Sequence, residues 1–389
     1  MSKAHTRGRP IVANAPSGEA TGRPPTSANS RPVGIKDIAK ALGLSNGTVD
    51  RALHSRGGIK PATKNRVLST ARKLGYKPNL AARYLKAPWQ VRLAVNLPAK
   101  IASFFDAVRA GVFEASGPFQ AGVDLCFRSH PTLGEEDEAL FEQALADGSK
   151  GIIIAPGHPA KLKPWIHKAK QKGIPVVCVA TDAPGTDRLT CVSADPFISG
   201  GLVGELLSRM ASGPGKVAVL TGDLSTFDHS EKVRGFKNSL ESTRSPLVLS
   251  AVLESHDDES AAYDQTRKLV LKEAQLKALY VSTANSIGVI RALEELDPDC
   301  RLAVITTDLF PQMAPYVKSG RILATIHQRP EAQGRLSFEA LYNFLVEGKC
   351  PALRIKLNPH VVMRSNLELF LERMSRHVSG NSLGAVKLP

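Results

Sequence analysis

Residues 35–53, with the sequence IKDIAKALGLSNGTVDRAL, decide the fold of the N-terminal part of the chain. Their first half carries an apolar residue every three or four positions, at Ile35, Ile38, Ala39 and Leu42. This spacing predicts a short amphipathic helix that ends at Gly43. Ser45 is a favourable N-cap for a second helix, whose apolar face carries Val49 and Leu53. Two short helices joined by a tight turn that contains glycine predict a helix-turn-helix.

A third helix is predicted after Gly57 and Gly58, because Pro61 suits the first helical position and Gly75 supplies the C-terminal stop. Its apolar stripe consists of Val67, Ala71 and Leu74. Basic side chains suited to phosphate contacts lie on this helix and its flanks, at Lys60, Lys64, Arg66, Arg72, Lys73 and Lys77.

Residues 79–88 predict a further helix of about two turns, with Asn79 as its cap and Pro88 at its end. A helix this short is marginal alone in water, so we expect it to form only when something packs against it.

The charge of the chain is concentrated at this end. Residues 1–90 hold 17 Lys and Arg against three acidic residues, a net charge of +14, whereas the other 299 residues hold 34 basic and 33 acidic side chains. A basic front joined to an electroneutral rear is typical of a nucleic-acid-binding module attached to a part with another task.

Length and composition narrow the class of protein. A chain of 389 residues with 42% hydrophobic residues suits two or three globular domains. The sequence has no run of 18 apolar residues, so it predicts no membrane span. Residues 1–32 lack the apolar stretch of a secretory signal, and their composition predicts a disordered basic tail. The five cysteines are scattered singly, which argues against a disulfide framework or a zinc site and favours a reducing cytoplasm.

Together with LGYKPNLAARYL at residues 74–85, the opening stretch strongly resembles the headpiece of the lactose-repressor (LacI/GalR) family over about fifty residues. The resemblance implies that residues 45–53 form the recognition helix in the DNA major groove. It places Asn46 and Gly47 at the main base-reading positions, Arg51 as a third reader, and Ser45 and Thr48 on phosphates.

The resemblance also assigns the residues 79–88 to a hinge helix that begins at Asn79. Leu85 matches the leucine that relatives wedge into the minor groove, and Ala82 lies where two hinge helices pack in a dimer. The sequence departs from the family at Gly47, which offers no side chain, and at Asp50, an acid where serine is common. The operator sequence therefore cannot be carried over from relatives.

From Val91 onward, apolar strand-like runs alternate with helical stretches. This alternation predicts parallel sheets with helices on both faces, and about ten such units predict two α/β lobes with a cleft between them. Ligands in such sheets bind outside the carboxyl ends of the strands. The expected fold is thus a small all-α headpiece followed by an α/β effector domain of two parallel-sheet lobes. The predicted boundaries are 1–32 for the tail, 33–78 for the headpiece, 79–88 for the hinge, 91–373 for the two-lobed domain and 374–389 for a flexible tail.

This part resembles the periplasmic sugar-binding-protein fold, most closely the ribose-type binders. The resemblance implies that Phe104 and Phe105 stack on a sugar face and that Asp308, at the end of VITTD, accepts hydrogen bonds from sugar hydroxyls. Gln328 follows Asp308 by twenty residues, as the ligand glutamine does in that group, and Asp195 is another matching acid.

Each of these assignments has a structural alternative. Phe104 and Phe105 also suit a core, Asp308 suits a cap for a helix from Pro311, and Asp195 suits a cap for a helix from Phe197. Further cleft candidates that follow strand-like runs are His158, Asp182, Asp228, His229, Lys232, Thr283 and Asn285.

Enzymatic signatures are missing from the sequence. SGPGK at residues 212–216 lacks the spacing of a phosphate-binding loop, and Gly200, Gly201 and Gly204 are better explained by close helix packing than by dinucleotide binding. There is no HExxH zinc motif. We expect no catalysis, no metal site and no cofactor.

The sequence thus predicts a cytoplasmic, DNA-binding transcription regulator, in particular a repressor, controlled by a small sugar. We expect a homodimer on a palindromic operator of double-stranded DNA and no membrane partner. A regulator with a nucleobase or sugar phosphate as effector is the first alternative. A periplasmic solute-binding protein is the second, opposed by the headpiece.

Overall fold

The computed structural model of the chain describes residues 33–53, 58–74, 91–283 and 286–380. The chain divides into two compact units, residues 1–87 and 88–389. The predicted N-terminal tail and the hinge residues Asn79, Ala82 and Leu85 lie outside the described residues.

The described residues of the first unit form three helices around one small core. They are α1 (Ile35–Leu42), α2 (Asn46–Leu53) and α3 (Pro61–Lys73). The core consists of Ile38, Ala39, Val49, Ala52, Val67 and Ala71. Gly43 ends α1 in the left-handed conformation, with φ of 62°, and the Ser45 hydroxyl accepts a hydrogen bond from the Thr48 N–H at 3.1 Å. The predicted helix-turn-helix is confirmed.

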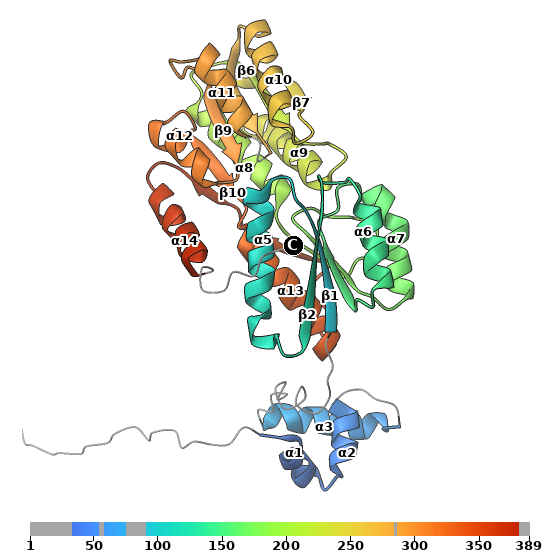
Figure 1. Ribbon diagram of the computed structural model, residues 1–389. Coiled ribbons are helices and arrows are strands. Elements are labelled where there is room, and N and C mark those ends of the chain that lie inside the picture. The colour runs from blue at the N-terminus through green and yellow to red at the C-terminus, as the bar shows by residue number, and fades with distance from the viewer. Residues whose placement is uncertain (1–32, 54–57, 75–90, 284–285, 381–389) are drawn as a thin grey trace, which may run out of the picture. The chain divides into compact units, whose positions relative to one another are not determined.

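The second unit is built on two six-stranded sheets (Figure 1). In the first lobe the strand order is β11-β5-β4-β3-β1-β2, and all neighbours are parallel. In the second lobe the order is β12-β10-β9-β8-β6-β7, and only β12 runs antiparallel to its neighbour. The strands of lobe 1 are β1 (Val91–Pro98), β2 (Val123–His130), β3 (Gly151–Ile154), β4 (Val176–Val179), β5 (Thr190–Ala194) and β11 (Arg354–Leu357). Those of lobe 2 are β6 (Gly215–Thr221), β7 (Leu247–Glu254), β8 (Leu276–Val281), β9 (Ala303–Thr307), β10 (Ala324–His327) and β12 (His360–Val362).

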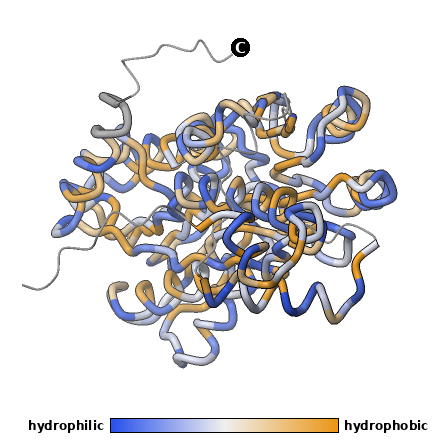
Figure 2. Tube along the Cα trace, turned by 90° about the horizontal axis from the view of Figure 1, so that it is seen from below, coloured by the Kyte–Doolittle hydropathy of each residue, from blue (hydrophilic) through white to orange (hydrophobic). Residues whose placement is uncertain are grey.

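Helices cover both faces of each sheet, as the strand–helix alternation predicts. In lobe 1 they are α5 (Ala102–Ser116), α6 (Asp137–Ala146), α7 (Pro159–Gln171) and α13 (Pro330–Glu347). In lobe 2 they are α8 (Pro196–Met210), α9 (Phe227–Ser242), α10 (Glu259–Lys272), α11 (Ser286–Leu296), α12 (Ala314–Ser319) and α14 (Leu367–Gly380). Short 3-10 turns lie at Gly117–Phe119 and Pro311–Met313. Along the helices, hydrophobic and hydrophilic residues alternate in the trace of Figure 2, as expected for helices that bury one face.

The chain passes between the lobes three times. The crossings lie between β5 and α8, between β10 and α13, and between β11 and β12. These three connections allow the two lobes to move as rigid bodies, so that the cleft between them opens or closes.

Close packing of α8 against α9 depends on glycine. A Cβ atom on Gly200 would lie 1.9 Å from the Lys232 carbonyl oxygen, and one on Gly235 would lie 2.0 Å from the Phe197 carbonyl oxygen. The predicted packing role of Gly200 is confirmed, and it fixes the position of α9, which carries Lys232 into the cleft.

The predicted start of the C-terminal tail is wrong. Helix α14 continues through Met374 to Gly380. Leu367, Phe370, Leu371 and Met374 recur at helical spacing and pack on the core of lobe 2, which stabilises the helix beyond the predicted boundary. Among the described residues, no helix combines the length and apolar character needed to cross a membrane.

Candidate functional site

The outer face of α2 is a polar surface presented to solvent. Val49 and Ala52 are buried in the core, whereas Asn46, Gly47 and Arg51 are exposed. The sequence predicts these three exposed residues as base readers, and helical spacing puts them on the face opposite the core.

Local hydrogen bonds preorganise this surface. Arg51 donates from Nε to the Gly47 carbonyl oxygen at 3.2 Å, while the hydroxyls of Ser45 and Thr48 lie 2.9 Å apart. A Cβ atom on Gly47 would meet nothing within 4 Å, so the fold itself does not require glycine there. The departure from the family at this position therefore concerns what the surface contacts and not how the helix packs.

A second site lies between the two lobes of the second unit. It is a small cavity of about 50 Å³, or about 450 Å³ when the adjoining space open to solvent is included. Its lining consists of Ile101, Phe104, Phe105, Leu133, Ala180, Thr181, Thr226, Asp228, His229, Lys232, Ser282, Thr283, Asp308 and Gln328. Four of the five predicted effector residues thus lie on one cavity, together with four of the further candidates.

Asp308 and Gln328 meet at the carboxyl ends of neighbouring strands. Asp308 follows β9 and Gln328 follows β10, and the Gln328 Nε2 donates to Asp308 Oδ2 at 2.8 Å. The other oxygen, Oδ1, is buried and has no hydrogen-bond partner in the part of the chain that the structure describes. The alternative role of Asp308 as a helix cap is wrong, because Phe310 precedes the turn that starts at Pro311 and no side chain caps it.

A buried ion pair forms the next part of the wall. Lys232 and Asp228 are one turn apart on α9, and Lys232 Nζ lies 2.6 Å from Asp228 Oδ2. Burial lowers the pKa of Lys232, but the carboxylates of Asp228 and Asp308 outweigh this and raise it above its ordinary value. Burial raises the pKa of Asp308 to about 6, with a further increase from Asp228, against opposing effects of Lys232 and Gln328.

Phe104 and Phe105, at the start of α5, suit both roles expected of them, as core residues and as part of a ligand site. Their rings form an edge-to-face pair with centroids 5.1 Å apart, and both residues are buried. Because both also line the cavity, they offer an aromatic surface to a bound molecule.

Hydrogen bonds across the cleft join the lobes around the cavity. The Asp228 N–H donates to the Thr181 hydroxyl at 3.2 Å, and the Thr226 hydroxyl donates to the Gly157 carbonyl at 3.1 Å. Residues that line the cavity therefore also touch the opposite lobe, so a molecule bound there could alter how the lobes close.

The effector role predicted for Asp195 is corrected by the structure. Asp195 is absent from the cavity lining; its Oδ1 accepts from the Ile198 N–H at 3.2 Å and its Oδ2 pairs with Lys356 at 2.6 Å. The alternative role as the cap of α8 is confirmed.

Two of the further candidates also lie elsewhere. His158 is near Ser225, with Nδ1 2.7 Å from the hydroxyl oxygen, and Asp182 pairs with Arg188 and Arg354. Asn285 lies outside the described residues.

Sequence reasoning missed several small residues of the cavity. Ala180 and Thr181 follow β4 and Ser282 follows β8, so their position after a buried strand was an available signal. Small residues carry no other pattern that sets them apart from ordinary loop residues.

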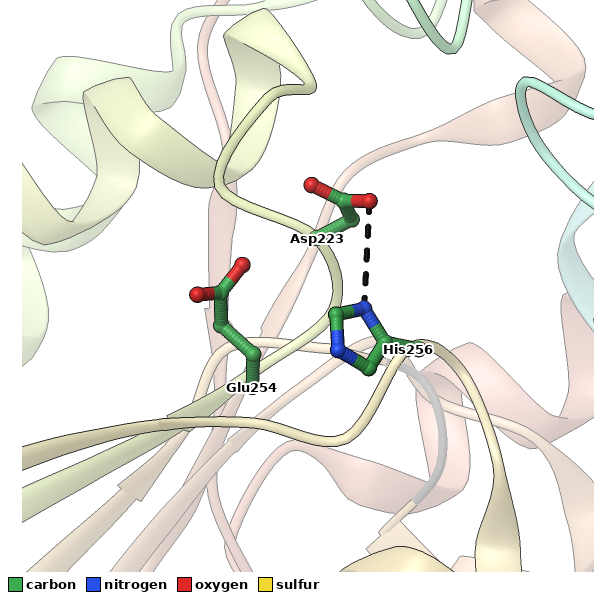
Figure 3. Close-up of side chains that lie close together, drawn as sticks. All are labelled: Asp223, Glu254 and His256. Atoms are coloured by element: carbon green, nitrogen blue, oxygen red, sulfur yellow. Dashed lines mark ion pairs between the residues drawn. The ribbon is translucent and has the colours of Figure 1, made fainter.

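One cluster has the composition of a cation site. Asp223, Glu254 and His256 each offer an atom within 4.8 Å of the others (Figure 3). His256 Nδ1 lies 3.8 Å from Asp223 Oδ2. The carboxylates also hold the following loop, since Leu224 N–H donates to Glu254 at 2.8 Å and Ser225 N–H donates to Asp223 at 2.7 Å.

Each of the two units matches the model of a known protein family. Residues 34–79 match the family model described as bacterial regulatory proteins, lacI family, and residues 93–349 match the model of a periplasmic binding protein domain. The chain belongs to the lacI family of bacterial regulatory proteins. It is a DNA-binding transcription regulator with an effector-binding domain of the periplasmic binding protein type.

Named relatives of this lacI-family regulator span most of its length. Catabolite control protein A of Priestia megaterium is 25% identical over 68% of this chain and 78% of the relative. The transcriptional repressor PurR of Edwardsiella ictaluri is 23% identical over 86% of this chain and 96% of the relative.

A solved structure resembles the two-lobed unit. GanP, a glucose-galactose binding protein from Geobacillus stearothermophilus, has a TM-score of 0.66 and 27% identity over 71% of this chain and 99% of its own. The predicted fold and the predicted family are both confirmed.

Proposed function

We propose that this lacI-family regulator is a repressor whose affinity for its operator is controlled by a small sugar bound between the lobes. The observation that carries the proposal is the combination, in one chain, of an exposed polar face on α2 with an interlobe cavity centred on Asp308 and Gln328.

The DNA-binding half rests on charge and surface. Residues 1–90 carry a net charge of +14, which attracts the phosphate backbone. Asn46 and Arg51 are side-chain types that read adenine and guanine edges in the major groove. In this proposal Ser45 and Thr48 contact phosphates, and Asn79, Ala82 and Leu85 act in the hinge as predicted.

The sugar half rests on the chemistry of the cavity. Carboxylate, amide and hydroxyl groups at strand ends suit sugar hydroxyls, which both donate and accept hydrogen bonds. Phe104 and Phe105 suit the C–H face of a sugar ring. The likeness to a glucose-galactose binding protein supports the same class of ligand.

The assembly and location follow from the proposed role. We propose a homodimer, because a two-fold axis matches a palindromic operator with two half-sites. Because the proposed partner is operator DNA, we also propose a cytoplasmic location. The relatives named above are transcriptional regulators, and we propose no catalytic activity.

The test combines selection of DNA with a screen of sugars. The full-length protein is used to select operator fragments from random DNA, and the footprint is mapped. Monosaccharides, sugar phosphates and nucleobases are then screened by thermal shift, since a ligand of the native state raises the melting temperature. A symmetric footprint weakened by a stabilising monosaccharide supports the proposal. A sequence-independent footprint, or an effector found only among the nucleobases or phosphates, contradicts it.

A further inference from the structure

The two walls of the interlobe cavity differ in chemistry. The eight lining residues of lobe 2 all carry polar side chains. Of the six lining residues of lobe 1, five have no side-chain hydrogen-bonding group, namely Ile101, Phe104, Phe105, Leu133 and Ala180. The sixth, Thr181, already accepts a hydrogen bond from the Asp228 N–H. A ligand here faces polar groups on one side and an apolar surface on the other.

The polar wall lacks hydrogen-bond donors for two of its own oxygens. Asp228 and Asp308 are each 7% exposed, and the Oδ1 atom of each is buried without a partner among the described residues. Buried carboxylate oxygens are seldom left unpaired, because the lost hydration is costly. A ligand that presents hydroxyl donors along one edge would satisfy both.

The charges of the wall disfavour an anion. Among the described lining residues, Lys232 is the only lysine or arginine, and it is already paired with Asp228. The His229 Nδ1 accepts a hydrogen bond from the Gly222 N–H at 3.2 Å and so faces the protein backbone. A phosphate would therefore face two carboxylates with no free cation to balance it.

We propose that the effector is a neutral deoxy sugar, with its hydroxyl-bearing edge on lobe 2 and its deoxygenated, apolar edge on lobe 1. This proposal rests on the proposed function and names the class of sugar. The matching hexose would place one more hydroxyl against the lobe 1 wall, where the described lining residues offer it one side-chain partner, Thr181, whose oxygen already accepts from the Asp228 N–H.

The test compares matched sugars on the full-length protein by calorimetry. The panel holds D-galactose, 6-deoxy-D-galactose and galactose 6-phosphate, the corresponding glucose set, and the pair L-mannose and L-rhamnose. We expect at least one 6-deoxy sugar to bind about tenfold to a hundredfold more tightly than its parent hexose, and neither phosphate to bind. Equal or tighter binding of every parent hexose, or binding of a phosphate, overturns the proposal while leaving a sugar effector in place.

A substitution in the apolar wall gives a second, independent test. Ala180 has a left-handed backbone, with φ of 67°, which asparagine adopts readily. Ala180→Asn adds a hydrogen-bonding amide to the lobe 1 wall, so the preference for the deoxy sugar should fall several-fold in favour of the hexose. Ala180→Gly suits the same backbone without adding a polar group and should leave the preference unchanged. An unchanged preference in Ala180→Asn that still binds operator overturns the proposal.

Different results contradict the deoxy-sugar proposal and the more general proposal of a sugar effector. If no sugar of the panel binds and none alters operator affinity, both the deoxy-sugar proposal and the sugar effector are contradicted. If hexoses bind and weaken operator binding without any deoxy preference, only the proposal about the walls of the cavity is wrong.

Discussion

Gln328 donates a hydrogen bond from its side-chain amide to the carboxylate of Asp308 at 2.8 Å, although the two residues are twenty positions apart in the sequence. Their strands, β9 and β10, are parallel neighbours, so their carboxyl ends open on the same cavity. The glutamine holds one carboxylate oxygen, and the other, Oδ1, has no hydrogen-bond donor among the described residues. This arrangement makes Asp308 the residue on which ligand binding is expected to depend most.

Asp308→Ala should weaken binding of the effector, and with it the response, without affecting the headpiece. Removal of the carboxylate leaves sugar hydroxyls without an acceptor in a buried site, at a cost of about 1–3 kcal/mol in binding. Calorimetry with the sugar found in the screen measures this. Asp195→Ala is the matched control, because Asp195 lies outside the cavity. Normal affinity in Asp308→Ala would contradict the assignment of the cavity.

The pH dependence of stability should report on Asp308. Its pKa is raised from 3.8 to about 6 by burial, so the native state retains this proton to higher pH than the unfolded chain. Protonated Asp308 therefore contributes about 3 kcal/mol to the free energy of unfolding below about pH 4, and this contribution is lost as the pH rises through 6. In Asp308→Asn, which is neutral throughout, urea denaturation between pH 4 and 7 should show a smaller decline. Identical profiles for the two proteins would exclude this carboxyl as the source.

Arg51→Ala should weaken operator binding by about 1–3 kcal/mol and relax the preference at one base position. Lys64→Ala, on α3, should instead weaken binding to all sequences and reduce the salt dependence by about one phosphate contact. Anisotropy titrations on the selected operator and on single-base variants separate the two effects. A uniform loss across all sequences in Arg51→Ala would show that Arg51 contacts only the backbone.

Gly200→Ala should destabilise lobe 2 by about 3 kcal/mol or more, because the new Cβ would lie 1.9 Å from the Lys232 carbonyl. The neighbouring Gly201→Ala is a close control. Its Cβ would lie 3.8 Å from the nearest atom, the Gly235 carbonyl oxygen, so it should be neutral or stabilise α8 by up to about 1 kcal/mol. Equal effects of the two substitutions in urea denaturation would argue against the close approach of α8 and α9.

Lys232→Met should cost about 3–5 kcal/mol of folding stability, because it leaves Asp228 as an unpaired buried charge. Arg335→Met, which removes an exposed pair with Glu339 at the same spacing on α13, should cost less than about 1 kcal/mol. The double change Lys232→Met with Asp228→Asn should recover most of the loss. No recovery would mean that the lysine acts through its packing rather than through its charge.

The parts of the structure that could be predicted are those set by local pattern. The headpiece helices follow from apolar spacing and from the caps at Gly43 and Ser45, and the strand–helix alternation gives the two-lobed architecture. Asp308 was found because an acid at the end of a buried strand in this fold opens on the cleft. Asp195 occupies the same kind of position, but its oxygen is taken by the Ile198 N–H, and a sequence does not distinguish a cap from a ligand contact.

The remaining features depend on contacts between distant segments. Whether α14 continues past Met374 is decided by its packing on lobe 2. The apolar character of the lobe 1 wall comes from residues on separate loops and a helix, such as Leu133 and Ala180, which no single stretch of sequence brings together.

Operator affinity with and without effector is the most direct test of the central claim that the Asp308–Gln328 cavity controls the headpiece. Anisotropy of the labelled, selected operator is measured with the wild type and with Asp308→Ala, each with and without the sugar at saturation for the wild type. The account predicts that the sugar weakens operator binding of the wild type at least about fivefold, a typical allosteric coupling, and leaves Asp308→Ala bound with wild-type affinity. An undiminished response to the sugar in Asp308→Ala, or a wild-type affinity that the bound sugar does not change, would contradict it.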